Sequence, residues 1–164
     1  MMTRSGLALI AAAFVWGAPV MAGAGAADAQ TAGEIESIAE KAAARPFIEH
    51  RVALQLSDGD PAKEGLIVSI ANKLLTVYGP DAVDVQVVAF GPGIDLLKAD
   101  SPRRQQVDSL IAQGVTFNIC DYTLETIERK TGKRPEMNPK ARPVPAGVPF
   151  LLSLAEKKYT IVRP

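Results

Sequence analysis

The sequence predicts an α/β protein with a mostly parallel sheet and helices on both of its faces. Segments of strand type and of helix type alternate along the chain from residue 50 onward, which is the order found in βαβ units. Residues 83–90 (VDVQVVAF) form a β-branched, largely apolar run, as expected of a strand covered on both faces. The 164 residues, of which 48% are hydrophobic, suffice for one domain with a sizeable core.

The first predicted strand and helix have clear boundaries. Apolar and polar side chains alternate over residues 50–57 (HRVALQLS), which predicts a strand. Asp60 is suited to cap a helix, and Pro61 to be its first residue. Apolar residues then recur at helical spacing until Gly79 and the proline after it end the helix.

The second and third strands flank another helix. Residues 91–93 (GPG) are expected to turn the chain after the second strand. A helix then begins near Ser101, and Gly114 stands where a C-cap glycine belongs. Residues 115–120 (VTFNIC) are the third predicted strand.

The last part of the domain contains a long, proline-rich connection. A helix that begins at Asp121 or Thr123 is expected to end near Gly132. Residues 133–149 hold five prolines, and a connection of this length is often functional when it is ordered. A short leucine-rich helix and a final strand at residues 159–162 complete the domain.

Residues 1–29 are predicted to be a secretory signal peptide. Arg4 is the only charged residue before Asp28, an apolar run follows it, and small residues precede Gln30 at the expected cleavage site. The mature protein is therefore expected in the bacterial periplasm. The alternative is an uncleaved membrane anchor, because residues 6–27 are uncharged. The abundance of Gly, Ala and Pro in the second half of that segment argues against an anchor.

Two further parts are predicted after the signal peptide. Residues 30–46 are expected to form a helical extension, since Thr31 and Glu34 have the spacing of a capping box. The extension is expected to pack on the domain or on a neighbouring subunit. The α/β domain itself is assigned to residues 47–164.

Charge and composition exclude several classes of function. The chain has 18 basic and 18 acidic residues, and cleavage would remove one of each. A neutral protein has no general attraction for nucleic acid or for an anionic membrane surface. One cysteine and one histidine cannot form a typical zinc site. No metal or cofactor is expected.

Cys120, the only cysteine, is the main candidate for a functional residue. It ends the third strand and precedes a helix, at the sheet edge where the catalytic groups of open α/β folds gather. The helix N-terminus favours the thiolate, whereas the neighbouring Asp121 opposes it. An unpaired cysteine in an exported protein is a reactive thiol, an intersubunit bridge or a buried apolar residue, and all three interpretations stay open here.

Other residues are predicted to meet Cys120 at the same edge. Gly91, Pro92 and Gly93 follow the neighbouring strand and could present backbone N–H groups, and Thr123 lies in the first turn of the next helix. Arg142 is taken as a binding residue from a basic group that could hold an anion. That group comprises Arg129, Lys130, Lys133, Arg134, Lys140 and Arg142. The alternative is that these basic residues only form a solvated loop.

Two further candidates are interpreted as structural. His50 enters the first strand at its amino end, whereas Cys120 leaves the third strand at its carboxyl end, so a Cys/His pair within one subunit is not expected. His50 is expected to make a local hydrogen bond. Asp58 and Asp60 could be an acid/base pair or cation ligands, but turn formation and helix capping explain them better.

Several motifs in order resemble the DsrE/DsrF-like (YchN-like) family. They are LQLSDGDP, Asn72 in the first helix, VVAFGPGIDLL, QGVTFNIC followed by TL, VPAGV and the terminal YTIVRP. The resemblance covers residues 50–164. With its predicted signal peptide, the chain resembles an exported subgroup of that family. It implies a small Rossmann-like three-layer sandwich with about five strands, assembled as trimers or hexamers.

The resemblance also implies a role for Cys120. In sulfur-relay members, a cysteine at the end of a strand carries sulfur as a persulfide, and Cys120 matches that position by its strand–Cys–helix context. The chain departs from those members in the residues after the cysteine, where Asp121, Tyr122 and Thr123 replace small residues.

Two functions compete at this point. The first is a sulfur carrier or thiol-exchange protein in which Cys120 accepts sulfur from a donor protein or a small anionic sulfur species. The second is a non-catalytic oligomeric module that binds a small ligand in the same cleft, with Cys120 structural. A disulfide between the Cys120 residues of two subunits is a third possibility, although a thiol at a pocket edge is poorly placed for symmetric pairing.

Overall fold

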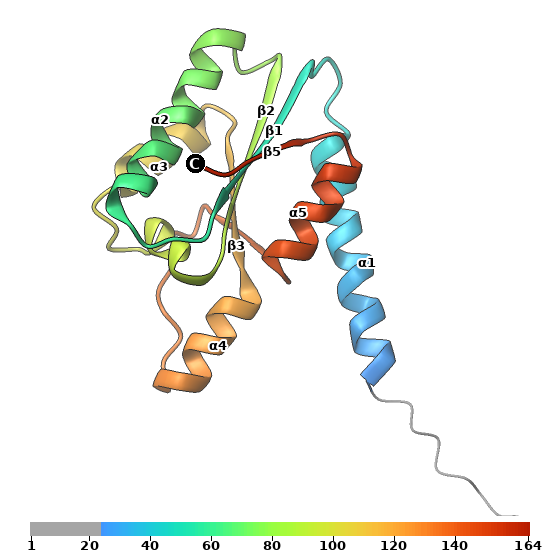
Figure 1. The fold of residues 1–164 in the computed structure, drawn as a ribbon, viewed down its shortest axis with the longest axis vertical. Coiled ribbons are helices and arrows are strands. Elements are labelled where there is room, and N and C mark those ends of the chain that lie inside the picture. Colours follow the sequence, from blue (N-terminus) through green and yellow to red (C-terminus); the bar gives the residue numbers. More distant parts are fainter. Residues whose placement is uncertain (1–23) are drawn as a thin grey trace, which may run out of the picture.

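The computed structural model describes residues 24–164, with side chains described from residue 27 onward. Five parallel strands form one sheet in the order β4-β3-β2-β1-β5 (Figure 1). The strands are β1 (His50–Leu56), β2 (Val83–Ala89), β3 (Thr116–Cys120), β4 (Arg142–Val144) and β5 (Thr160–Val162). The predicted α/β fold with a parallel sheet is therefore confirmed.

Helices cover the sheet on both faces, as predicted. They are α1 (Ala24–Ala43), α2 (Pro61–Tyr78), the 3-10 helix η1 (Gly91–Leu97), α3 (Arg104–Ala112), α4 (Asp121–Thr131) and α5 (Gly147–Glu156). The larger core lies between the sheet and α2, α3 and η1, and a second core lies between the sheet, α5 and α1. Figure 1 shows α2 and α3 on one side of the sheet and α5 with α1 on the other.

The predicted boundaries of the first βα unit are confirmed. The Asp60 carboxylate accepts a hydrogen bond from the backbone N–H of Ala62 at 2.8 Å, and Pro61 is the first residue of α2. Gly79 ends the helix with a φ of 81°, a value that glycine adopts without strain. The seven residues of β2 are all buried, in agreement with a central strand.

The proline-rich connection contains a strand that the sequence did not reveal. β4 pairs with β3, with Asn118 opposite Arg142 and Cys120 opposite Val144. The strand is only three residues long and includes a proline, which is tolerated because β4 lies at the edge of the sheet. The turn predicted at residues 91–93 is the start of η1 rather than a simple turn.

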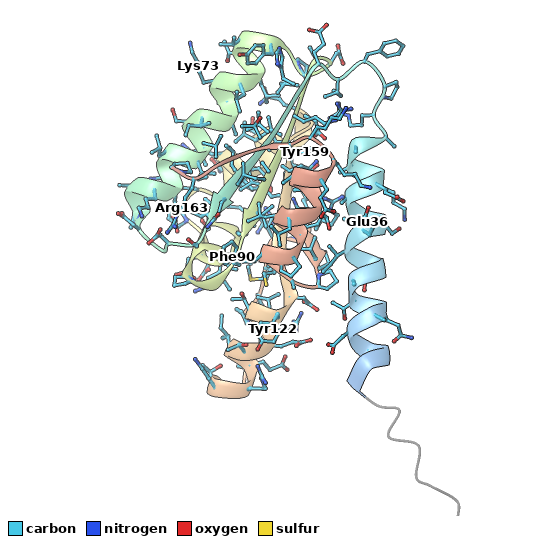
Figure 2. The ribbon with its side chains drawn as sticks, turned by 45° about the vertical axis from the view of Figure 1, so that its right-hand side comes forward. Glu36, Lys73, Phe90, Tyr122, Tyr159 and Arg163 are labelled. Carbon is cyan, nitrogen blue, oxygen red and sulfur yellow. The ribbon has the colours of Figure 1, made fainter. Side chains whose placement is uncertain are left out.

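The N-terminal extension is a helix, α1, that begins earlier than predicted. It packs against α5 through Ile35, Ala39 and Ala42, and the Lys157 ammonium forms ion pairs with the Glu36 and Glu40 carboxylates. Figure 2 shows Glu36 on the length of α1 that runs beside α5. Residues 1–23, most of the predicted signal peptide, lie outside the described residues. Within residues 24–164, no helix combines the length and apolarity needed to cross a membrane.

Candidate functional site

A cleft of about 380 Å³ opens at the carboxyl edge of the sheet, between η1 and α4. It forms there because β2 and β3 are neighbours, so the segments that follow them face one another. Three of the predicted site residues, Gly91, Pro92 and Thr123, line it together. The complete lining is Gly91, Pro92, Ile94, Asp95, Tyr122, Thr123, Thr126, Ile127 and Lys130.

A hydrogen bond joins the two walls of this cleft. The backbone N–H of Gly91, the first residue of η1, donates to the Thr123 hydroxyl oxygen at 3.0 Å. Thr123 therefore binds a protein N–H group and does not simply face an empty pocket. The bond also occupies the Gly91 N–H group, so that group cannot hold a ligand as part of a backbone cradle.

Gly93 does not line the cleft, although the sequence suggested it as a binding residue. It is buried behind the cleft wall, where a Cβ atom would lie 2.3 Å from the carbonyl oxygen of Leu56. Side-chain carbons never come that close to a backbone oxygen. Gly93 is thus needed for the close approach of η1 to the end of β1, and its role is to shape the cleft from behind.

Sequence analysis named Lys130 only as a member of the basic group, and it did not predict that Tyr122 and Thr126 join Lys130 in the second wall of the cleft. Tyr122, Thr126 and Lys130 are spaced by four residues and so lie on one face of the helix. The Tyr122 side chain is 61% exposed, and the Arg129 guanidinium lies 5.9 Å from the centre of its ring. The four-residue spacing in the sequence was the one signal that could have predicted this wall. It is not specific, because residues on any solvent-exposed face of a helix have the same spacing.

Cys120 ends β3, as predicted, but its thiol does not open into the cleft. The residue is only 5% exposed, and its sulfur accepts a hydrogen bond from the backbone N–H of Gly147 at 3.3 Å. Gly147 is the first residue of α5. Cys120 and Asn118 are two residues apart on one strand, so their side chains point to the same face of the sheet, the face that α5 covers.

The basic residues of the proline-rich segment do not converge on Cys120. Arg134 pairs with Asp121 and lies 3.6 Å from the Glu128 carboxylate. Lys140 forms an ion pair with Asp108 on α3 at 3.3 Å. These ion pairs hold the proline-rich segment against α4 and α3, and they do not form an anion site around the thiol.

Arg142 lies in β4 and does not line the cleft. Its Nε donates to the Asn118 side-chain oxygen at 2.8 Å, and its Nη2 donates to the Gln86 side-chain oxygen at 3.1 Å. The guanidinium also lies 5.6 Å from the centre of the Phe150 ring on α5. Burial lowers the pKa of Arg142 below its usual value, while the charge of Asp84 acts in the opposite direction. Arg142 thus binds other side chains of the protein and does not contribute to the cleft.

These contacts continue as a row of buried polar side chains across the sheet, beneath α1 and α5. Gln86 donates from its side-chain nitrogen to the Asp84 carboxylate at 3.2 Å. The same carboxylate accepts hydrogen bonds from the Tyr159 hydroxyl and, at 3.3 Å, from Arg45. Burial and the bond to Asp84 raise the pKa of Tyr159 far above its usual range. Sequence analysis missed this row.

The remaining candidates have structural partners. His50 lies at the amino end of β1, on the opposite sheet edge from Cys120, and its ring packs 4.1 Å from that of Tyr78. The two rings are tilted by 41°, and the His50 side chain makes this contact rather than the expected local hydrogen bond within the described part of the chain. Asp58 forms an ion pair with Lys63 at 2.7 Å, and Asp60 caps α2. Among residues 24–164, no group of His, Cys, Asp and Glu is arranged to hold a metal.

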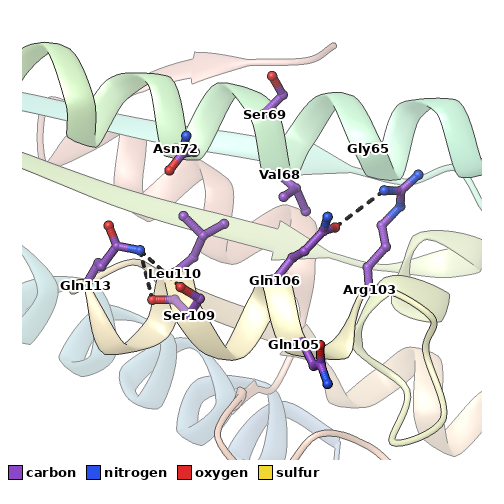
Figure 3. Close-up of a pocket in the computed structure, with 10 residues that line it drawn as sticks. All are labelled: Gly65, Val68, Ser69, Asn72, Arg103, Gln105, Gln106, Ser109, Leu110 and Gln113. Carbon is purple, nitrogen blue, oxygen red and sulfur yellow. Dashed lines mark hydrogen bonds between the residues drawn. The ribbon is translucent and has the colours of Figure 1, made fainter.

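Two other clefts in the described part of the chain have linings that do not include the predicted site residues, although the second is lined by Asp121, Tyr122 and Pro143, which are next to them in the sequence. One, of about 480 Å³, runs between α2 and α3 and is lined mainly by uncharged polar side chains (Figure 3). In it, Gln113 donates to the Ser109 hydroxyl and Arg103 donates to Gln106. The other, of about 500 Å³, lies between α1 and α4 and includes four acidic side chains: Asp28, Glu34, Asp121 and Glu125.

Comparison with known proteins gives a fold but no function. No protein-family model matches the chain, and no curated protein matches it. A solved structure of a protein of unknown function from Methanobacterium thermoautotrophicum matches with a TM-score of 0.63 and 24% sequence identity. The match covers 70% of this chain and 99% of that one. The chain has a small Rossmann-like α/β fold.

Proposed function

We propose that the protein is an exported, DsrE/DsrF-like module that binds a small, largely apolar ligand in the cleft between η1 and α4. The observation that carries this proposal is the cleft itself, which brings Gly91, Pro92 and Thr123 together at the carboxyl edge. Ligands of open α/β folds bind at this edge, and the volume of about 380 Å³ is in the range of small-molecule sites.

The surroundings of Cys120 favour binding over sulfur transfer. The thiol is buried, faces α5 and is absent from the lining of the cleft. Free cysteine often packs as a small apolar side chain. The resemblance further suggests a periplasmic homo-oligomer, a trimer or hexamer, whose subunits each carry one cleft. Light scattering on the purified mature protein tests that part of the proposal.

Titration with indole, a small neutral apolar molecule, tests the binding function. We expect dose-dependent shifts of the backbone amide signals of Gly91 and Thr123 in nitrogen–proton NMR spectra. Thr126→Phe would place a ring in the cleft and should abolish the shifts. Thr131→Phe is the matched control, because Thr131 is exposed at the end of the same helix and does not line the cleft. The absence of shifts in the unmodified protein would refute the function.

A sulfur carrier is the second candidate, and one observation favours it. The Cys120 sulfur lies against the N–H of the first residue of α5, and Cys120 also precedes α4. Helix N-termini stabilise a thiolate. In this role the Cys120 thiolate would attack the outer sulfur of a donor persulfide. The sulfur–sulfur bond of the donor would break, its thiolate would leave, and Cys120 would hold the new persulfide.

Alkylation of Cys120 as a function of pH, with mass spectrometry of an unreduced sample, separates the two candidates. The packed thiol of the binding module should label only after denaturation. Rapid labelling of the native protein with an apparent pKa well below about 8.5 would favour the carrier. If a Cys120→Ser variant still accepts labelled sulfane sulfur, the carrier role is wrong.

A further inference from the structure

We infer that the cleft between η1 and α4 selects a small molecule with an apolar ring and a carboxylate, and that Lys130 recognises the carboxylate. This inference rests on the proposed binding function and adds the chemical class of the ligand. It follows from the distribution of charge around a cleft whose walls are mainly apolar or uncharged.

Among the residues that the structure describes, Lys130 is the only basic one that lines the cleft, and Asp95 is the only acidic one. The Asp95 carboxylate is already paired with the ammonium of Lys98 at 2.6 Å. Lys130, by contrast, makes no ion pair or side-chain hydrogen bond with any residue in the described part of the chain. The rim of the cleft thus presents one positive charge that is not neutralised by a protein group.

The walls define the rest of the ligand. Pro92, Ile127 and the ring of Tyr122 supply apolar surface, against which a flat hydrocarbon or aromatic body can pack. The Thr123 hydroxyl accepts the Gly91 N–H, which leaves its own proton free to donate. Thr123 and Lys130 are seven residues apart on α4, or about 10 Å along the helix axis. A bicyclic ring with a short acidic arm has about this length.

A carboxylate fits this charge better than a phosphate does. Phosphate sites generally combine several donors, such as arginine forks, helix N-termini and backbone N–H groups. Here the Gly91 N–H is occupied by Thr123, and the Thr126 hydroxyl is bonded to the Tyr122 carbonyl and to Arg129. One lysine ammonium is suited to one singly charged group.

The test compares indoleacetate with indole, its neutral counterpart, in NMR titrations of the full mature protein. We expect indoleacetate to bind about two- to fivefold more tightly than indole, the factor that corresponds to an exposed ion pair. Lys130→Gln should remove this preference, measured as the ratio of the indoleacetate and indole affinities within the same variant. Added salt should weaken the binding of indoleacetate only. Lys73→Gln is the control, since Lys73 is an exposed lysine on α2, remote from the cleft (Figure 2).

The failures of the two proposals are distinguishable. If indole binds, and indoleacetate binds no better or keeps its preference in Lys130→Gln, the inference about Lys130 is wrong and the binding function stands. If neither compound shifts the amide signals of the cleft, both proposals are wrong. A loss of preference in Lys73→Gln as well would show a general effect of protein charge and would also overturn the inference.

Discussion

The backbone N–H of Gly91 and the hydroxyl of Thr123 share a hydrogen bond of 3.0 Å, although the two residues are 32 positions apart in the sequence. The bond links the segment after β2 to the first turn of α4. It therefore fixes the separation of the two walls of the cleft. A ligand that enters the cleft must contact walls whose spacing is already set.

Replacing Thr123 by Val should destabilise the protein by about 1 kcal/mol, because the partly buried N–H of Gly91 loses its acceptor. Thr123→Ser keeps the hydroxyl and should cost less. Urea denaturation of both variants measures the difference. Equal stability of the two variants would mean that water replaces the Thr123 hydroxyl and that the bond does not hold the walls together.

Replacing Gly93 by Ala should lower the free energy of unfolding much more, by at least about 2 kcal/mol, because the added carbon collides with the backbone of Leu56. Gly33→Ala is the matched control. Gly33 lies within α1 with open space around it, so this change should stabilise the protein by about 0.5–1 kcal/mol through helix propensity. Denaturation midpoints and soluble yield report both effects. A Gly93→Ala protein as stable as the original would contradict the tight approach of η1 to β1.

Replacing Tyr159 by Phe should cost about 1.5–3 kcal/mol, the range for a hydrogen bond to a charged group. The change removes a hydroxyl that donates to the Asp84 carboxylate, which is 1% exposed. Tyr122→Phe should change stability by less than about 0.5 kcal/mol, since that ring is on the surface. Thermal or urea unfolding compares the two variants, and equal effects would argue against a structural role for the polar row.

The pH dependence of stability should reveal the contribution of the ionised Asp108 carboxylate. A hydrogen bond from Asn138, helped by Lys140 and Arg104, holds the pKa of the Asp108 carboxyl below its usual value of 3.8. Because the folded-state pKa is lower than the unfolded one, the stabilisation is complete above the unfolded pKa. It is lost as the pH falls through the folded pKa.

An Asp108→Asn variant provides the measurement. It should be less stable than the original protein at pH 7. The difference between the free energies of unfolding of the two proteins should decrease steadily below about pH 4. Asp100→Asn, at an exposed acidic residue, should follow the curve of the original protein. A gap that stays constant down to pH 2 would show that the ionisation of Asp108 does not contribute.

The position of the cleft could be predicted from the sequence because the two strands next to it, β2 and β3, are mainly apolar and have clear ends. Gly91 follows the end of β2 and Thr123 follows the end of β3. Because β2 and β3 pair in parallel, the two residues lie together at one edge of the sheet. The same reasoning could not tell which way Cys120 points. A side chain at a strand end turns to one face or the other according to register, and here that face is the one under α5.

The internal contacts of Arg142 could not be predicted from the sequence, for a different reason. Its partners, Gln86 and Asn118, are distant in sequence, and β4 is too short to show any period. A signal was nevertheless present in VDVQVVAF, where Asp84 and Gln86 alternate with apolar residues and so share one face. Polar residues at alternate positions of a buried strand require polar partners on that face, and arginine in a nearby segment is a natural one.

The packing of α1 bears on how the N-terminus tolerates processing. Among the side chains described for this helix, the buried apolar ones, Ile35, Ala39 and Ala42, all lie after Gln30, whereas residues 27–34 are exposed. A protease that cuts before Gln30 would thus shorten the helix at its solvent-exposed end and leave its attachment to α5 complete. The cleft between α1 and α4 would lose the Asp28 carboxylate, so maturation would alter the charge of that surface without loosening the fold beneath it.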